Sequence, residues 1–230
     1  MGNYATRRGA RTGATLWRVS CDGPEKHVVP DGVMDLMWFQ DRLVVAGADT
    51  RTMVMETRPG EVTWGLQLAP GVAYALLGVP ADELTDQRVE LSELVSLSGP
   101  WSFEDDVADA LERVLIALWT QADPERAILR EAASLDRAAR EGLSVREMAE
   151  LHDLPERSLR RLSKRLFGYG PKTLTRIHRF QHALHLVRAG LPLSEAAATA
   201  GYADQAHFTR ESNLLAGRTP AALAGRFVQS

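Results

Sequence analysis

The spacing of hydrophobic positions changes near residue 100 and divides the chain into two parts. Between residue 15 and about residue 70, short runs of β-branched and aromatic residues alternate with turn signals, which is typical of β-strands. After residue 100, hydrophobic residues recur every three or four positions, which is the period of an amphipathic helix. The pattern therefore predicts a mostly antiparallel β part followed by an all-α part.

Within the first part, two pairs of strands are predicted from runs that flank short turn sequences. The predicted pairs are residues 33–39 with 42–48, around Gln-Asp, and residues 52–57 with 61–68, around Arg-Pro-Gly. The stretch 71–79 favours a short helix and 81–95 favours helical turns. Residues 1–14 are basic and lack an apolar run, so we expect a flexible tail and no signal peptide.

The all-α part begins with an amphipathic stripe of five regularly spaced residues, Phe103, Val107, Leu111, Val114 and Leu118. This helix can dimerise or pack on its own β part, and the sequence leaves both open. The next helix is predicted to start near Pro124 and to run to residues 141–142.

Near the end of the chain, the sequence LSEAAATAGYADQAHFTRESNLLAG breaks one helix and starts another. Gly201 can take a positive φ at little cost, which suits a sharp turn between them. Ser194 and Asp204 are placed to cap the two helices. The spacing predicts a helix-turn-helix unit.

The second helix of this unit has a core face and a polar face at about 100° per residue. Phe208, Ser212 and Leu215 gather on the core face. The polar face and its edges hold Gln205, Ala206, His207, Thr209, Arg210 and Asn213. Since Gln and Arg can make paired hydrogen bonds to base edges, these positions are predicted to contact DNA in a major groove.

Residues 143–168 repeat the same plan about 49 residues earlier. Asp153-Leu154 stand where Gly201-Tyr202 stand, and leucines 159, 162 and 166 form the core stripe. The outward residues are basic: Arg157, Arg161 and Lys164, flanked by Arg160 and Arg165. Five cations on one short helix repel each other, which favours an anionic partner over a merely solvated face.

A helix predicted over residues 170–190 joins the two units. About 17 residues at ~1.5 Å each span about 25 Å, which holds two reading helices at a fixed separation. Arg176 and Arg179 on this helix are predicted to contact phosphates.

The distribution of charge supports a DNA-binding C-terminal part. Residues 135–230 hold 15 Lys and Arg against 9 Asp and Glu, whereas the first 134 residues hold 12 against 21. The net charges are therefore +6 and −9, so only the C-terminal part favours a polyanion.

Residues 124–230 resemble the DNA-binding domain of the AraC/XylS family of transcription regulators. The matching features are Ser158-Leu159-Arg160-Arg161-Leu162, Gly168, Gly170-Pro171-Lys172, Arg179, Ala183, Ala196-Ala197, Gly201-Tyr202, Phe208-Thr209-Arg210 and Gly217-Arg218-Thr219-Pro220. The resemblance implies seven helices, with recognition helices at residues 156–167 and 204–215. Three positions depart from the family pattern: Ser212, Asn213 and Leu223-Ala224.

The stretches VVPDGVMDLMWF, VAGADTR and PGVAYALLGVPADELTD resemble a short, cupin-like N-terminal domain of some such regulators. That resemblance implies a small-ligand sensor or a dimerisation module. Trp38, Trp64 and Tyr74, with Met34, Met37 and Met55, are predicted to line a ligand pocket, and the alternative is that they are simply the core of the domain. Asp31, Asp35 and His27 form too loose a set for a metal site, and turn formation explains Asp31-Gly32 better.

Taken together, the sequence predicts an α+β protein with a tail (1–14), a β-rich sensor or dimerisation domain (15–121) and a DNA-binding domain (124–230). We expect a bacterial, cytoplasmic transcription regulator, since the single Cys21 excludes an internal disulfide and no apolar run could span a membrane. The expected partners are double-stranded DNA, a small effector, a second copy and, for an activator, RNA polymerase. No cofactor or metal is expected. A constitutive or architectural DNA-binding protein and a metal-dependent cupin-like enzyme are the alternatives.

Overall fold

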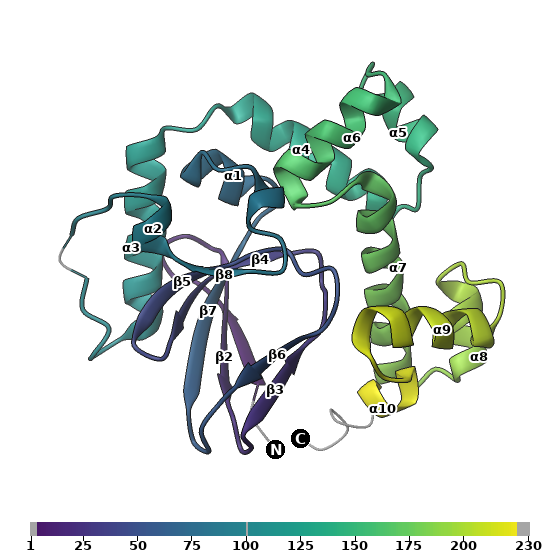
Figure 1. Ribbon diagram of the computed structural model, residues 1–230, viewed down its shortest axis with the longest axis horizontal. Coiled ribbons are helices and arrows are strands. Elements are labelled where there is room, and N and C mark those ends of the chain that lie inside the picture. The colour runs from purple at the N-terminus through teal and green to yellow at the C-terminus, as the bar shows by residue number, and fades with distance from the viewer. Residues whose placement is uncertain (1–3, 100, 225–230) are drawn as a thin grey trace.

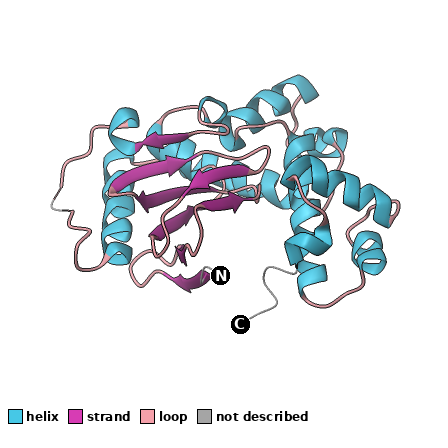
Figure 2. Ribbon diagram, turned by 60° about the horizontal axis from the view of Figure 1, so that its bottom comes forward, coloured by secondary structure: helices cyan, strands magenta, loops and turns pink. Residues whose placement is uncertain are grey.

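The computed structural model describes residues 4–99 and 101–224, which form a β-rich N-terminal part and a helical C-terminal part (Figures 1 and 2). The strands are β1 Tyr4–Arg8, β2 Thr15–Ser20, β3 Glu25–Val28, β4 Met34–Phe39, β5 Arg42–Ala46, β6 Met53–Glu56, β7 Val62–Leu68 and β8 Arg88–Glu90. The helices are α1 Val72–Leu77, the 3₁₀ turn η1 Ala81–Glu83, α2 Leu91–Leu94, α3 Val107–Ala122, α4 Arg126–Arg140, α5 Val145–Leu151, α6 Glu156–Phe167, α7 Pro171–Arg188, α8 Leu193–Thr199, α9 Gln205–Ala216 and α10 Pro220–Ala224. The predicted α+β architecture is confirmed.

Six strands form one antiparallel sheet in the order β1-β2-β7-β4-β5-β8. Because side chains alternate along each strand, the sheet has two different faces. Leu16, Leu36 and Leu66 point to the face that α3 covers, at the left of Figure 1. Trp17 and Met37 point to the other face. Strand β8 lies where only helical turns were predicted.

The second predicted hairpin is wrong, although the first is confirmed. Residues 53–56 and 62–68 do not pair with each other: β7 pairs with β2 and β4, and β6 pairs with β3. The backbone N–H of Cys21 donates to the carbonyl of Glu61 (2.9 Å), and that of Thr57 donates to the carbonyl of Pro24 (2.8 Å). These bonds join the segment of residues 21–24 to the segment of residues 57–61, where both segments bend. The segments β2–β3 and β6–β7 are therefore two long bent strands that run side by side, and Arg-Pro-Gly fills a bend.

The predicted flexible tail over residues 1–14 is also wrong for its described part. Strand β1 hydrogen-bonds along β2 and forms one edge of the sheet. The turn that follows is held by Glu112 of α3, which is only 2% exposed. Its carboxylate accepts bonds from the backbone N–H of Arg11 (2.9 Å) and of Thr12 (2.7 Å). These bonds lower the pKa of Glu112 although burial alone would raise it.

The helices of the C-terminal part follow the predicted order with small shifts at their ends. Helix α3 starts at Val107, capped by Asp106, because Phe103 lies before it and stacks on Trp38 with ring centroids 3.9 Å apart. Helix α4 starts at Arg126 rather than at Pro124. Within the described residues, α4 to α10 supply the seven helices that the family resemblance implied.

The two parts share one continuous hydrophobic core across the α3–α4 connection. Thr85 donates a hydrogen bond to the carbonyl of Gly168 (2.9 Å), and the N–H of Thr52 donates to the carbonyl of Leu215 (2.9 Å). The first bond lies at the end of α6 and the second at the end of α9. Helices α6 and α9 are therefore both anchored to the N-terminal part.

We expect Gly168→Ala to destabilise the protein by about 2–4 kcal/mol, measured as the free energy of unfolding in denaturant. Gly168 has φ +84, and a Cβ there would lie 2.5 Å from Oγ1 of Thr85. Gly142→Ala is the matched control, because Gly142 has φ +80 and no atom within 4 Å of its Cβ position. Gly142→Ala should lower the free energy of unfolding only by the backbone strain, about 1–2 kcal/mol. Equal losses in the two variants would show that the Thr85 contact contributes nothing.

Candidate nucleic-acid interface

Helix α6 presents a basic surface to solvent. Its Leu159 and Leu166 are buried against the core, which fixes the rotation of the helix. The predicted DNA-contacting residues Arg157, Arg160, Arg161 and Lys164 are all exposed. Arg160 makes an ion pair with Glu156 one turn earlier (2.8 Å), whereas Arg157, Arg161 and Lys164 have no ion pair among the described residues.

Helix α9 presents a polar, less charged surface. Of the predicted contact residues, Gln205, Ala206 and Arg210 are exposed, while His207 and Thr209 are half-buried. The predicted cap is confirmed, because Asp204 accepts a hydrogen bond from the backbone N–H of His207 (2.6 Å). The ring of His207 meets Tyr202 edge-on, so its position is fixed by the core below it.

The two units hold their recognition helices by the same contacts. In the first unit, the buried Ser163 donates to the carbonyl of Tyr169 (2.7 Å); 49 positions later, Ser212 donates to the carbonyl of Arg218 (2.6 Å). Asp153 takes a positive φ of 50°, as Gly201 does with 78°. The departure from the family pattern at Ser212 therefore gives the second unit the same anchor as the first.

The cap predicted for α8 is wrong. Helix α8 starts after Pro192, and Ser194 lies within its first turn without capping it. Leu223 and Ala224, two further departures from the family pattern, are buried on α10.

Arg176 and Arg179 of α7 both make ion pairs with α9. Both reach Glu211, which is 6% exposed, with N–O distances of 3.5 and 3.0 Å. The guanidinium of Arg179 also lies 4.4 Å from the ring centre of Tyr202. These two arginines position α9 on α7, and any phosphate contact by Arg176 competes with this ion pair. The sequence reasoning missed Glu211, although two arginines three residues apart were a signal for a buried acid.

A second polar cluster fixes α7 on α4. His178 and Asp136 form a buried pair 2.8 Å apart, and Arg140 makes an ion pair with the same carboxylate (2.7 Å). Burial raises the pKa of Asp136, but the bonds from His178 and Arg140 outweigh it and leave the pKa below its usual value. The helix that separates the two units is therefore rigidly seated.

The predicted ligand residues do not surround a cavity. Trp38 stacks on Phe103, Arg18 lies over Trp64, and Arg165 of α6 lies over Tyr74. Strand alternation places both tryptophans on the sheet face that the helices cover. A cavity of about 710 Å³ lies on the opposite face, and none of the three residues lines it.

Comparisons with known proteins agree with this architecture. Residues 148–226 match the family described as a helix-turn-helix domain, which is of the AraC type, and residues 14–90 match a domain of unknown function (DUF6597). No curated protein sequence matches the chain. The N-terminal β part is consistent with the cupin-like domain that the sequence indicated.

One solved structure is similar in fold over nearly the whole chain, and two others match parts of it. ToxT from Vibrio cholerae O395 is 7% identical, covers 99% of each chain and has a TM-score of 0.53. A probable AraC family transcriptional regulator from Rhodopseudomonas palustris CGA009 is 20% identical over 42% of this chain and 96% of its own (TM-score 0.37). The C-terminal domain of AraT, a response regulator from Geobacillus stearothermophilus, is 21% identical over 46% and 89% (TM-score 0.40).

Two kinds of feature are absent from the described residues. No helix in them is both long and apolar enough to cross a membrane. They hold no group of three or more His, Cys, Asp or Glu side chains that could bind a metal ion.

Proposed function

We propose that this chain, a DNA-binding transcription regulator with an AraC-type helix-turn-helix domain, reads a specific DNA sequence through α6 and α9. The observation that carries the proposal is the pair of equivalently anchored helices on one rigid spacer, α7, of 18 residues. Two recognition helices held this way can enter successive major grooves on one face of the duplex, about 34 Å apart.

The two helices are suited to different parts of the same task. Arg157, Arg161 and Lys164 of α6 provide charge for phosphates and guanine edges. Gln205 and Arg210 of α9 provide paired donors and acceptors for individual bases. The first unit is proposed to supply most of the affinity, and the second unit to discriminate between sequences.

Control by an effector is the proposed mode of regulation. The cavity of about 710 Å³ supports it, because Gln181, Arg188 and Arg218 of the C-terminal part line it together with the β part. Dimerisation through α3 has less support, since its stripe of Leu111, Val114 and Leu118 is buried in the protein's own core. Action as an activator through RNA polymerase stays part of the proposal.

DNA selected from a random library by the full-length protein should contain a shared motif, and affinity for that motif should depend steeply on salt. Neutralising several phosphates releases counterions, so we expect affinity to fall by at least about tenfold between 50 and 200 mM salt. Fluorescence anisotropy with the selected duplex and a scrambled duplex measures both quantities. Equal affinity for the two duplexes would support the architectural alternative, and a flat salt response would contradict the basic interface.

A further inference from the structure

The cavity lies between the six-stranded sheet and the bent β3–β6 ribbon. Its volume of about 710 Å³ is in the usual range of small-molecule sites, about 300–1,000 Å³. One wall is apolar and aromatic and consists of Trp17, Val19, Met37 and Met55. Some charged side chains in its lining form ion pairs with each other and others do not. The charges without an ion pair indicate what the cavity can bind.

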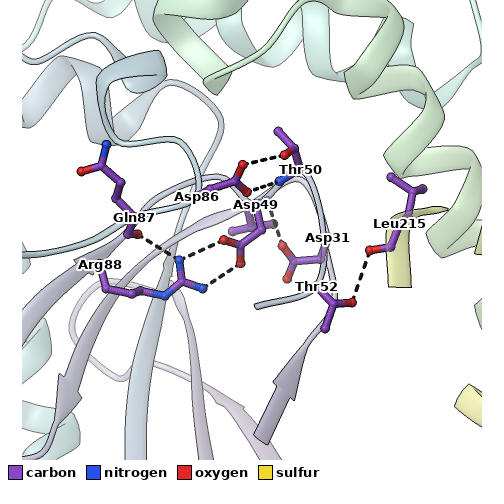
Figure 3. Close-up of polar contacts among 9 residues, drawn as sticks. Asp31, Asp49, Thr50, Thr52, Asp86, Gln87, Arg88 and Leu215 are labelled. Carbon is purple, nitrogen blue, oxygen red and sulfur yellow. Dashed lines mark hydrogen bonds and ion pairs between the residues drawn. The ribbon is translucent and has the colours of Figure 1, made fainter. Parts of the chain in front are cut away.

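Two carboxylates in the lining, those of Asp31 and Asp35, make no ion pair with a described residue. Asp35 accepts a hydrogen bond from the indole N–H of Trp17 (2.8 Å), and Asp31 accepts one from the backbone N–H of Val33 (3.0 Å). Among the described residues, neither carboxylate lies within ion-pair distance of a Lys, Arg or His. Asp49, by contrast, is neutralised by Arg88 through two bonds of 2.9 and 2.7 Å, beside Asp31 (Figure 3).

Three basic side chains of the lining contact groups other than these two carboxylates. Arg88 is held by Asp49, and Arg218 lies 3.2 Å from Nε2 of His27. The ammonium of Lys26 lies 5.0 Å from the ring centre of Trp17, so it contacts the indole face rather than a carboxylate. At the sheet side of the cavity, the carboxylates of Asp31, Asp35 and Asp49 outnumber the cations of Arg88 and Lys26, which leaves a negative balance there.

The hydroxyl of Tyr169, a buried group on which these carboxylates act, is a polar group without a hydrogen-bond partner among the described residues. Tyr169 lies in the α6–α7 connection and is 5% exposed. Asp31 and Asp49 are the charges that act on it most strongly, and with burial they raise its pKa. Burial likewise raises the pKa of Asp35 to about 7, and repulsion by Asp31 adds to the shift. Desolvation and the charge of Asp49 also raise the pKa of Asp31, although part of its surface stays exposed.

We propose that this cavity binds an organic amine, with the ammonium group between Asp31 and Asp35 and the apolar body against Trp17, Met37 and Met55. An ammonium ion there would pair directly with the two carboxylates, which no described Lys, Arg or His does, and the aromatic and Met side chains form an adaptable apolar wall. The inference rests on the proposed function, because it names the chemical class of the effector. An occupant that also reaches Gln181 or Arg218 contacts both parts of the protein and can shift their relative position.

The test is a calorimetric titration of the full-length protein at pH 8 and without DNA. The probes are 2-phenylethylamine, tryptamine and hexylamine, each compared with a carboxylate and an alcohol of matching size. We expect the amines to bind at least about tenfold more tightly than their counterparts, since a charge-assisted bond is worth about 1.5–3 kcal/mol. The proposal is overturned if no amine binds, or if the carboxylates or alcohols bind equally well.

Two variants separate a direct role from a change in folding. Asp35→Asn keeps the shape and the acceptor for Trp17 but removes the charge, and it should weaken amine binding at least about tenfold. Glu93→Gln on α2 also removes one exposed negative charge but lies outside the cavity lining, so it should bind amines like the original protein. Asp31→Asn serves as the second test if Asp35→Asn shows a lowered melting temperature. Unchanged amine affinity in a folded Asp35→Asn protein contradicts the proposal.

The pH dependence gives an independent readout. The groups that act on Asp35 are Asp31, the Trp17 indole, Lys26 and Arg88. Because the raised pKa keeps Asp35 protonated at pH 5.5, amine binding should be weaker there than at pH 8, and this difference should shrink in Asp35→Asn. A binding constant independent of pH in the original protein would count against the carboxylates as ligands. DNA affinity is measured separately, so loss of DNA binding with intact amine binding contradicts only the proposed function.

Discussion

Replacing Arg157, Arg161 and Lys164 together by alanine should lower the affinity for the selected DNA motif by at least about a hundredfold. Each side chain that contacts a base edge contributes about 1–3 kcal/mol, and each phosphate contact adds to the salt-dependent term. All three side chains are exposed and without ion pairs among the described residues, so their loss leaves the packing of α6 unchanged. Anisotropy titrations at 100 mM salt measure the change.

A second triple variant, Arg7, Arg42 and Arg58 to alanine, serves as the control. It removes the same charge from exposed positions of the N-terminal part. A uniform electrostatic effect would weaken DNA binding equally in both variants. Full affinity in the α6 variant would show that this helix does not face DNA. A reduced salt dependence in the α6 variant alone would support phosphate contacts there.

Glu211→Ala should lower the free energy of unfolding by about 2–4 kcal/mol, because it leaves Arg176 and Arg179 facing each other without the acid between them. For a chain of this length, that loss lowers the melting temperature by about 5–15 °C. DNA affinity should fall as well, since α9 loses its bonds to the spacer helix. Thermal unfolding and anisotropy measure the two effects separately.

Glu195→Ala on the neighbouring α8 is the control, because Glu195 is exposed and makes no ion pair among the described residues. It should change the melting temperature by no more than about 2 °C. If Glu211→Ala is as stable as this control, the cluster with Arg176 and Arg179 does not hold the second unit. Those two arginines would then be available for phosphates, as the sequence alone predicted.

The helical part could be predicted closely because its signals are local. Capping by Asp204, the positive φ at Gly201 and the stripe of Phe208 and Leu215 all depend on residues within one or two turns. The resemblance to AraC-type regulators added the number of helices. Glu211 was missed because its partners lie on another helix, more than 30 positions earlier.

The β part was predicted less well because its pairing is not local. Residues 53–56 and 62–68 look like a hairpin when read along the chain, and only the bonds to residues 21–24 show that they continue one bent strand. The tail was misjudged for the same reason, since Glu112 lies 100 positions away from Thr12. The cavity face could have been inferred, because Trp17 and Met37 occupy the strand positions opposite to Leu16 and Leu36.

The matching serine anchors have a consequence for how such a protein can change over generations. Ser163 and Ser212 fix the ends of α6 and α9 through the same backbone bond, so the support is separate from the outward residues. Substitutions at Arg161 or Arg210 alter one reading surface and leave its anchor, and the other surface, in place. If α6 and α9 read DNA as proposed, the two halves of the binding site can change independently, and a new target sequence requires changes in only one of the two helices.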